Sequence, residues 1–403
     1  MLTAVRSRRT ARLEALASDP PQRTVQVVSP SPMIIPEPRA LRREPPRKPE
    51  EMQEDYHERF DAKTLFYDTY RCGEDIWLSG PPLRNLKRPV RRRGQWYVDG
   101  RELDSESVSI SDWGRTQRSR IVRPGAGSEL ALDMKGFWLR SKIGDDGAHL
   151  FAGRNTVVTK SADNDLVWIQ DWLRWYHDVH GVTGVVFYEN NSTKYRAEDI
   201  AAAITKVEGI EVAVVVDWQF KWGPSAGPYQ RWDSDYSQYS MLEHARFRFL
   251  RQAAGVVSCD IDELVLTDDG RTVFDHAREA PDGVIKYHGI YIGKVTPFEM
   301  DAERQRRFVD YRYREGARNS TPKWTTIPSM SDPETTQWWV HSVRGIEPKI
   351  TDAVTHRHYR GVSTGWKYNL REVTARDGEH VRDEEMDPVL DLVFGPTPAS
   401  TDA

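Results

Sequence analysis

The central part of the chain, residues 151 to about 290, alternates between short apolar runs and longer segments with apolar side chains at helical spacing. Four apolar runs predict strands, at residues 155–159, 185–188, 212–216 and 256–259. Three segments with apolar residues three and four positions apart predict helices, at residues 165–180, 197–207 and 236–254. Strands and helices in alternation predict an α/β fold of βαβ units around a mostly parallel sheet.

The two flanks differ from this central part. Residues 1–58 are rich in Arg and Pro and predict a disordered tail, because they offer too little apolar area to offset the entropy of ordering. Residues 59–150 contain short apolar runs broken by Gly, Pro and Asp, which predict a small β-rich accessory domain. We expect the main domain to cover residues 151–372 and a C-terminal tail to cover residues 373–403.

Charge and composition exclude several classes of protein. The chain has 57 Lys and Arg against 61 Asp and Glu, and this near balance offers no overall field for nucleic acid. No apolar stretch approaches the ~20 residues that span a bilayer, and the first residues lack the apolar core of a secretory signal. Two cysteines are too few for a disulfide framework. We expect a cytoplasmic protein with no nucleic-acid partner and no transmembrane segment, and a peripheral contact of the Arg-rich tail with anionic lipid stays open.

Polar side chains follow each of the predicted strands. They are Thr159-Lys160-Ser161, residues 189–192, Asp217, and Asp260-Ile261-Asp262-Glu263. Ligands of open α/β sheets bind at the carboxyl ends of the strands, so these residues are expected to line a binding site.

The last of these groups predicts a metal site. In an extended segment Asp260 and Asp262 share one side, and two neighbouring carboxylates repel each other unless a cation relieves them. Mn²⁺ or Mg²⁺ is the expected partner, because such hard ions take carboxylate and phosphate oxygens.

Other interpretations of this motif stay open. A surface loop with solvated acids has the same pattern. An Asp-nucleophile phosphohydrolase of the dehalogenase type would use Asp260 as nucleophile and Asp262 as acid, although its pattern calls for Thr or Val where Leu264 stands. A non-catalytic carbohydrate-binding protein would explain the 14 tryptophans, since aromatic rings bind sugars.

Three segments carry a resemblance to a known family. They are TVVTKSADNDLVWIQDWLRWYHDVHGVTGVVFYENNST, QYSMLEHARFRFLRQAAGVVSCDIDELVL, and the order PKWTTIP, WWVHSV, HRHYRG. Together they span about residues 155–361 and resemble the GT-A glycosyltransferases of family 92 and their bacterial relatives. Glu189 and Lys194 stand where relatives commonly have Asp, and Leu264 stands where they have Phe.

The resemblance implies a Rossmann-like sheet with flanking helices and a metal-dependent glycosyltransferase. It implies a nucleotide-sugar donor, with a UDP-sugar favoured, a glycan or glycoconjugate acceptor hydroxyl, and inversion at the anomeric carbon. Retention through a covalent intermediate stays open. Thr159, Lys160 and Asn190 match positions that line the nucleotide pocket, and Asp217 and Asp260 join them at the strand ends.

Residues after 320 supply further candidates. His356 and His358 alternate onto one face of an extended segment, and His358, or alternatively His356, is a candidate metal ligand. Asp332 and Glu334 are candidates for the base that takes the acceptor's proton. Contacts to acceptor or phosphate are assigned to Lys323, His341 and Arg360, for which a core histidine and surface ion pairs are the alternatives.

Overall fold

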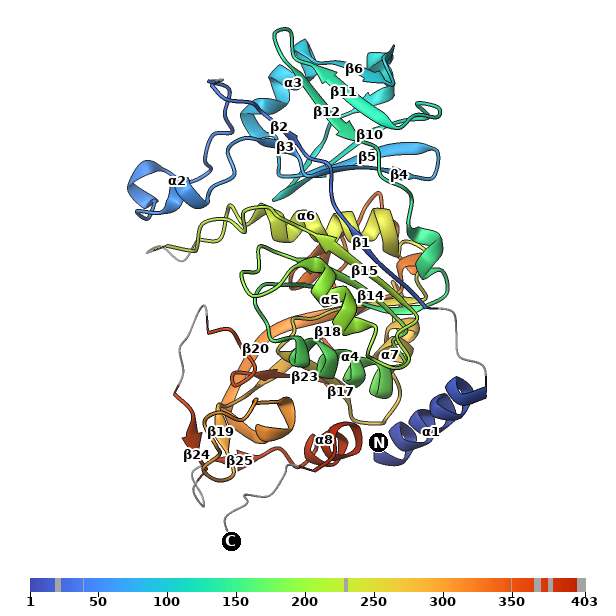
Figure 1. The fold of residues 1–403 in the computed structure, drawn as a ribbon, viewed down its shortest axis with the longest axis vertical. Coiled ribbons are helices and arrows are strands. Elements are labelled where there is room, and N and C mark those ends of the chain that lie inside the picture. The colour runs from blue at the N-terminus through green and yellow to red at the C-terminus, as the bar shows by residue number, and fades with distance from the viewer. Residues whose placement is uncertain are drawn as a thin grey trace.

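The computed structural model describes residues 1–18, 23–38, 40–227, 231–348, 350–365, 371–375 and 380–396. The chain forms a small β-rich unit above a larger unit of helices and strands (Figure 1). The larger unit is built on a mixed sheet of ten strands, so the expected α/β class is confirmed.

The large sheet is half parallel and half antiparallel. Its order is β1 (Thr24–Val28), β15 (Val212–Asp217), β14 (Gly184–Glu189), β13 (Asn155–Ser161), β16 (Gly255–Ser258), β20 (Tyr313–Thr326), β18 (Val284–Ile292), β23 (Val354–Tyr359) and β17 (Glu263–Thr267), with β25 (Val381–Arg382) beside β20. The strands from β1 to β16 pair in parallel, whereas β20 pairs antiparallel with β16 and β18. The expectation of a mostly parallel sheet therefore does not hold beyond β16, where the pairing is mixed. Strand β20 is antiparallel to β16 and β18, and β17 is antiparallel to β23, while β18 and β23 pair in parallel.

Helices cover both faces of the parallel half. They are α4 (Leu166–His180), α5 (Ala197–Ile204), α6 (Tyr236–His244), continued as a π-helix over Ala245–Leu250, and α7 (Val273–Glu279). In β15, Ala213 and Val215 pack in the core that contains α4 and α5, while Val214 and Val216 pack in the core that contains α6. This strand is buried on both faces, which explains its unbroken apolar sequence.

The N-terminal segment is ordered and belongs to the fold. Helix α1 (Leu2–Ser18) places Val5 in the core, and its Arg9 forms an ion pair of 2.9 Å with Asp178 of α4. Strand β1 then pairs in parallel with β15 along its whole length. The expected disordered tail over residues 1–58 is wrong for the described residues, because strand pairing with a partner far along the chain orders a segment of low apolar content. Residues 19–22 and 39 lie outside the described residues.

Buried arginines hold the proline-rich part of this segment. The guanidinium of Arg43 donates to the backbone carbonyls of Pro82 (2.8 Å), Asp61 (2.5 Å) and Thr64 (2.5 Å). Arg47 forms an ion pair of 2.9 Å with Asp233. Their guanidinium groups donate hydrogen bonds to carbonyl groups, which apolar side chains could not do. The polar composition of this segment therefore did not indicate disorder.

The C-terminal segment is also part of the larger unit. Helix α8 (Asp387–Phe394) buries Val389, Leu390 and Val393 in the core that contains α4. Asp383 binds the buried guanidinium of Arg357 at 2.6 Å. The expected tail over residues 373–403 is wrong for residues 373–375 and 380–396, while residues 376–379 and 397–403 lie outside the described residues.

The small unit has the expected β-rich character. One sheet contains β4 (Asp68–Cys72), β5 (Asp75–Gly80), β10 (Thr116–Ile121), β8 (Val108–Ser109) and β9 (Asp112–Trp113), and the other contains β12 (Trp138–Lys142), β11 (Glu129–Asp133), β6 (Gln95–Val98) and β7 (Arg101–Glu102). Short elements complete the fold: β2 (Met33–Ile34), β3 (Thr64–Phe66), α2 (Tyr56–Arg59), α3 (Lys87–Arg93), β19 (Val295–Thr296), β24 (Val373–Thr374), β21 (Gln337–Trp339) and β22 (Ser342–Arg344).

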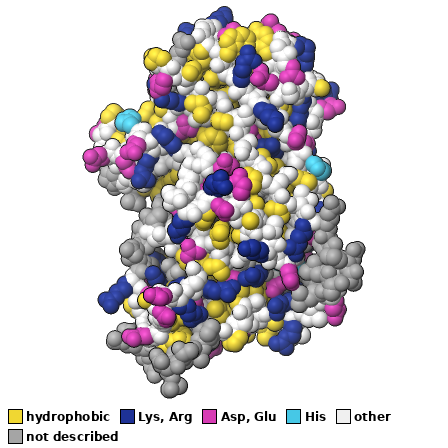
Figure 2. All heavy atoms as spheres, viewed as in Figure 1, with side chains coloured by type: hydrophobic (Ala, Val, Ile, Leu, Met, Phe, Trp, Pro, Cys, Tyr) yellow, Lys and Arg dark blue, Asp and Glu magenta, His cyan; other side chains and the backbone are white. Residues whose placement is uncertain are grey.

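A buried polar network joins the two units. Asp68 of β4 accepts from His244 of α6 at 2.9 Å and from Arg248 at 2.6 Å. Tyr188 of β14 lies 2.7 Å from the other ring nitrogen of His244. Helix α6 thus lies between the sheet of the larger unit and the small unit (Figure 1). On the face shown in Figure 2, basic and acidic side chains are interspersed, as the near-balanced charge leads one to expect.

Candidate functional site

A tight turn carries the two aspartates from β16 into β17. The backbone N–H of Asp260 donates to the carboxylate of Glu263 (3.0 Å), and the N–H of Glu263 donates back to the carbonyl of Asp260 (3.1 Å). The carbonyl of Asp262 accepts from the N–H of Tyr359 (2.8 Å), which fixes the turn to the end of β23. Both aspartates therefore lie at the carboxyl end of a central strand, where the sequence placed them.

The turn gathers a set of metal-ligand atoms. Carboxylate oxygens of Asp260, Asp262 and Glu263 lie within 4.8 Å of one another, and so do ligand atoms of Glu263, His356 and His358. Oxygen and imidazole ligands at this spacing could hold a metal ion. Glu263 joins both sets. It was expected to line the binding site at the end of this strand, but it was not predicted as a metal ligand.

His358 fits the role of a metal ligand better than His356. Its Nε2 lies 3.4 Å from Oδ2 of Asp262, its Nδ1 lies 3.4 Å from Oε1 of Glu263, and its side chain is 28% exposed. Burial lowers the pKa of His358, but the charge of Asp262 outweighs this and raises it to about 9. His356 is fully buried, and its Nε2 is engaged with the hydroxyl of Ser320 at 2.9 Å.

Lys323 lies among the carboxylates. Its Nζ is 2.6 Å from Oδ2 of Asp260 and 2.8 Å from Oε2 of Glu263. Burial acts to lower the pKa of Lys323, but the two acids raise it well above its ordinary value. Burial would likewise raise the pKa of Asp260, yet the ammonium of Lys323 lowers it to about 2. The structure thus makes Lys323 a partner of the aspartate motif.

A small pocket of about 20 Å³, which is room for roughly one water molecule, lies beside Asp260. Thr159, Lys160, Gln238, Lys323 and Val340 are among the residues that line it. Thr159 is 2% exposed, and its hydroxyl has no hydrogen-bond partner among the described residues. A buried hydroxyl without a partner is costly, and a ligand in the pocket is one way to satisfy it.

Lys160 brings a buried ammonium to this pocket. Its Nζ lies 3.1 Å from the hydroxyl of Ser237 and 5.4 Å from the ring centroid of Trp222. Burial lowers the pKa of Lys160 to about 7, although Asp235 and Asp260 act to raise it. Thr159 and Lys160, both predicted to bind the nucleotide, thus line the same pocket as Asp260.

Two other residues that were predicted to bind the nucleotide, Asn190 and Asp217, contact other parts of the fold. The amide of Asn190 donates to the carbonyls of Trp218 and Phe220, both at 2.8 Å, so it shapes the loop after β15. Asp217 accepts from Gln219 at 2.6 Å, and β14 separates it from the strand that carries Thr159. Neither residue is among the described residues that line the pocket beside Asp260.

The candidate base residues lie against the small unit. Thr326 of β20 pairs with Val256, so the loop that follows lies at the end of β16 opposite to Asp260. In that loop, Glu334 forms an ion pair of 3.2 Å with Arg120 of β10. The N–H of Glu334 also binds the side chain of Asp332 (2.9 Å). The structure does not bring these two acids to the metal-ligand cluster.

His341 and Arg360 are the remaining residues that were predicted to contact acceptor or phosphate. His341 is exposed at the turn between β21 and β22, and its Nδ1 lies 3.2 Å from the carbonyl of Pro322. Its charge contributes to the lowered pKa of Asp260, which places it near the site. Arg360 forms an ion pair of 2.5 Å with Glu315 and lies 4.4 Å over the ring of Tyr291. Arg360 therefore forms the kind of ion pair that was the alternative to a phosphate contact.

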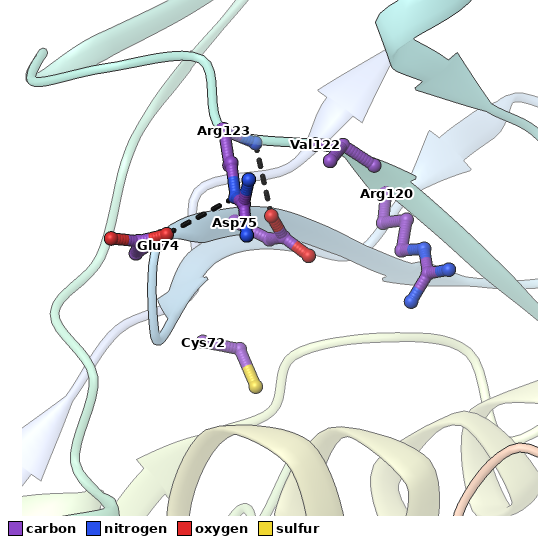
Figure 3. A pocket seen from close by; sticks show the side chains of 6 residues that line it. All are labelled: Cys72, Glu74, Asp75, Arg120, Val122 and Arg123. Carbon is purple, nitrogen blue, oxygen red and sulfur yellow. Dashed lines mark hydrogen bonds and ion pairs between the residues drawn. The ribbon is translucent and has the colours of Figure 1, made fainter.

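A second hollow lies in the small unit (Figure 3). Cys72, Glu74, Asp75, Arg120, Val122 and Arg123 line it. Arg123 forms an ion pair of 3.2 Å with Glu74, and its N–H donates to Asp75 (3.0 Å). Burial raises the pKa of the Cys72 thiol to about 11, so it is not a ready nucleophile. We do not take this hollow as the functional site, because its charges neutralise one another.

Comparisons with known proteins found no match: no protein-family model matches the chain, and no curated protein matches its sequence. Among the described residues no helix has the length and apolar character needed to cross a bilayer.

Proposed function

We propose that the chain is a metal-dependent glycosyltransferase with a GT-A-type domain, which moves a sugar from a nucleotide-sugar donor to an acceptor hydroxyl. The observation that carries the proposal is the cluster of Asp260, Asp262, Glu263 and His358 at the carboxyl end of β16, next to a pocket. The family resemblance of residues 155–361 adds the donor class, with a UDP-sugar favoured and a glycan or glycoconjugate as acceptor.

The residues have distinct roles in this proposal. Asp260, Asp262 and His358 hold the divalent ion, which, when bound, offsets the charge that develops on the departing diphosphate. Lys323 and Lys160 place ammonium groups beside the same pocket and bind phosphate oxygens. Thr159 donates its hydroxyl to the ligand. In the proposed transfer, the oxygen of the acceptor hydroxyl would bond to the anomeric carbon as the bond from that carbon to the diphosphate breaks. The diphosphate would leave, and the hydroxyl proton would pass to water.

A thermal-shift panel of nucleoside diphosphates, with Mn²⁺ or with EDTA, tests the proposal. A ligand that binds the folded state raises the melting temperature with the logarithm of its excess over Kd. We expect UDP to stabilise the protein only with Mn²⁺, and we expect Asp260→Asn to abolish the shift. Thr69→Val, a substitution in the small unit, is the matched control and should keep it.

Two alternative functions give different outcomes. An Asp-nucleophile phosphohydrolase would release phosphate from small phosphoesters without any acceptor, and Asp260→Asn would abolish that release. A non-catalytic carbohydrate-binding protein would bind glycan equally well with EDTA and without nucleotide. Absence of any nucleotide shift with Mn²⁺ would contradict the glycosyltransferase proposal.

A further inference from the structure

The β21–β22 hairpin extends from the metal-ligand cluster toward the small unit. Val340, in its turn, lines the pocket beside Asp260. On one face of the hairpin, Trp338 and Val343 are buried in the core that contains α6. Because side chains alternate along each strand, Trp339 of β21 and Arg344 of β22 both lie on the opposite face. The turn of the hairpin therefore lies at the pocket, and its two strands extend from that turn.

The small unit contacts this second face. Gly114, at the β9–β10 turn, has φ +61, and a Cβ there would lie 3.1 Å from the ring of Trp339 and 3.3 Å from the guanidinium of Arg344. The amide of Gln337 donates to the carbonyl of Trp113 (2.9 Å). Arg115 lies 5.6 Å from the Trp339 ring centroid. The small unit thus packs against the face of the hairpin that carries Trp339 and Arg344.

The two arginines on this surface differ in their partners. Arg115 forms an ion pair of 3.0 Å with Asp235 and donates to the hydroxyl of Tyr239 (2.8 Å). Arg344 is exposed, lies 4.2 Å over the ring of Trp339, and forms an ion pair with no carboxylate of the described residues. A guanidinium held by an aromatic ring keeps its donors in a planar fork, which matches a carboxylate or a phosphate.

We propose that Arg344, held on Trp339, binds an anionic group of the acceptor glycan, either a carboxylate or a phosphate on a sugar beyond the one that reacts. The inference rests on the proposed function, since it assigns the acceptor of the same site. Arg344 ends β22, three residues after His341, and an extended segment of that length spans about 10 Å. An acceptor that reaches from the pocket to Arg344 therefore contains more than one sugar unit.

Affinity electrophoresis tests this assignment with three polymers in the gel: polygalacturonate, phosphomannan and neutral dextran. At about 0.15 M salt, long-range attraction is screened, and contact interactions dominate. We expect wild-type protein to be retarded by one or both acidic polymers and not by dextran. Arg344→Gln should weaken the retardation roughly tenfold, as the loss of a charge-assisted contact does. The polymer that retards the protein identifies the group as carboxylate or phosphate.

The matched control is Arg92→Gln, which makes the same charge change at an exposed position of α3. Equal loss in both variants, or equal mobility of wild-type protein in all three gels, would overturn the assignment. The thermal shift with UDP and Mn²⁺ tells a failure of the Arg344 assignment from a failure of the proposed function. Arg344→Gln should keep that stabilisation, whereas its absence in wild-type protein would count against the proposed function itself.

Discussion

The Nζ atom of Lys323 lies 2.6 Å from Oδ2 of Asp260, so the first aspartate of the metal-ligand cluster already has a cationic partner within the fold. The same ammonium lies 2.8 Å from Glu263 and is 3% exposed. Three carboxylates in one turn would repel one another, and Lys323 offsets part of their charge. The remaining negative charge is what a divalent ion would neutralise.

Removal of this ammonium should destabilise the protein strongly. Lys323→Met leaves Asp260 and Glu263 without their cation, and we expect a loss of about 3–5 kcal/mol in the free energy of unfolding. Urea unfolding at neutral pH measures it. The double variant Lys323→Met with Glu263→Gln should recover part of the loss, because one of the two acids becomes neutral. A loss below about 1 kcal/mol in the single variant would contradict the ion-pair account.

The lowered pKa of Lys160 predicts that the free energy of unfolding depends on pH. Burial lowers its pKa to about 7 from 10.5, so between these values the unfolded chain binds a proton that the folded chain does not. Stability of the wild-type protein should therefore rise with pH across this window. Lys160→Met should be more stable than wild type at pH 6, and its advantage should shrink by about 1 kcal/mol per pH unit above pH 7.

Urea unfolding at several pH values measures this difference. Lys206→Met removes an exposed lysine and is the control, for which we expect no such trend. A difference between Lys160→Met and wild type that stays constant from pH 6 to pH 9 would show that the buried ammonium does not titrate as stated.

Substitution of Thr159 tests whether its hydroxyl contacts the ligand or only contributes to the stability of the fold. Thr159→Val removes a buried hydroxyl that has no partner among the described residues, so we expect equal or slightly higher stability, by about 0.5–1 kcal/mol. The same change should reduce the thermal shift that UDP and Mn²⁺ produce. Thr69→Val removes another such buried hydroxyl, in the small unit, and should keep the full shift. An undiminished shift in Thr159→Val would exclude the hydroxyl as a ligand contact.

The N-terminal segment gives a test of the fold itself. Deletion of residues 1–28 removes α1 and β1 and exposes the apolar edge of β15. We expect a lower melting temperature and aggregation in size-exclusion chromatography, because a bare apolar strand edge pairs with other chains. An unchanged melting temperature and a monomeric profile would instead fit a disordered tail.

Local sequence patterns predicted the parallel half of the sheet and the position of its site. The apolar run at 212–216 became a strand buried on both faces, and the aspartates after 256–259 lie at the carboxyl end of β16. These features depend on side-chain periodicity within one segment, which is visible in a single sequence.

Other features depend on contacts between distant segments. β1 is ordered by pairing with β15, and Lys323 meets Asp260 because β20 runs antiparallel to β16. The same pairing carries Asp332 and Glu334 away from the cluster. Neither the partner of a strand nor its direction follows from local periodicity, so these contacts could not be predicted from composition and spacing.

The central claim, that Asp260 and Asp262 hold a divalent ion with a nucleotide, can be measured directly by electron paramagnetic resonance of free Mn²⁺. Titration of Mn²⁺ into wild-type protein with UDP should show one ion bound per chain, as a loss of the free-ion signal. Asp260→Asn with Asp262→Asn should leave that signal undiminished, while Asp217→Asn should bind as wild type does. Equal binding by the doubly substituted protein, or no binding by wild type, would contradict the account.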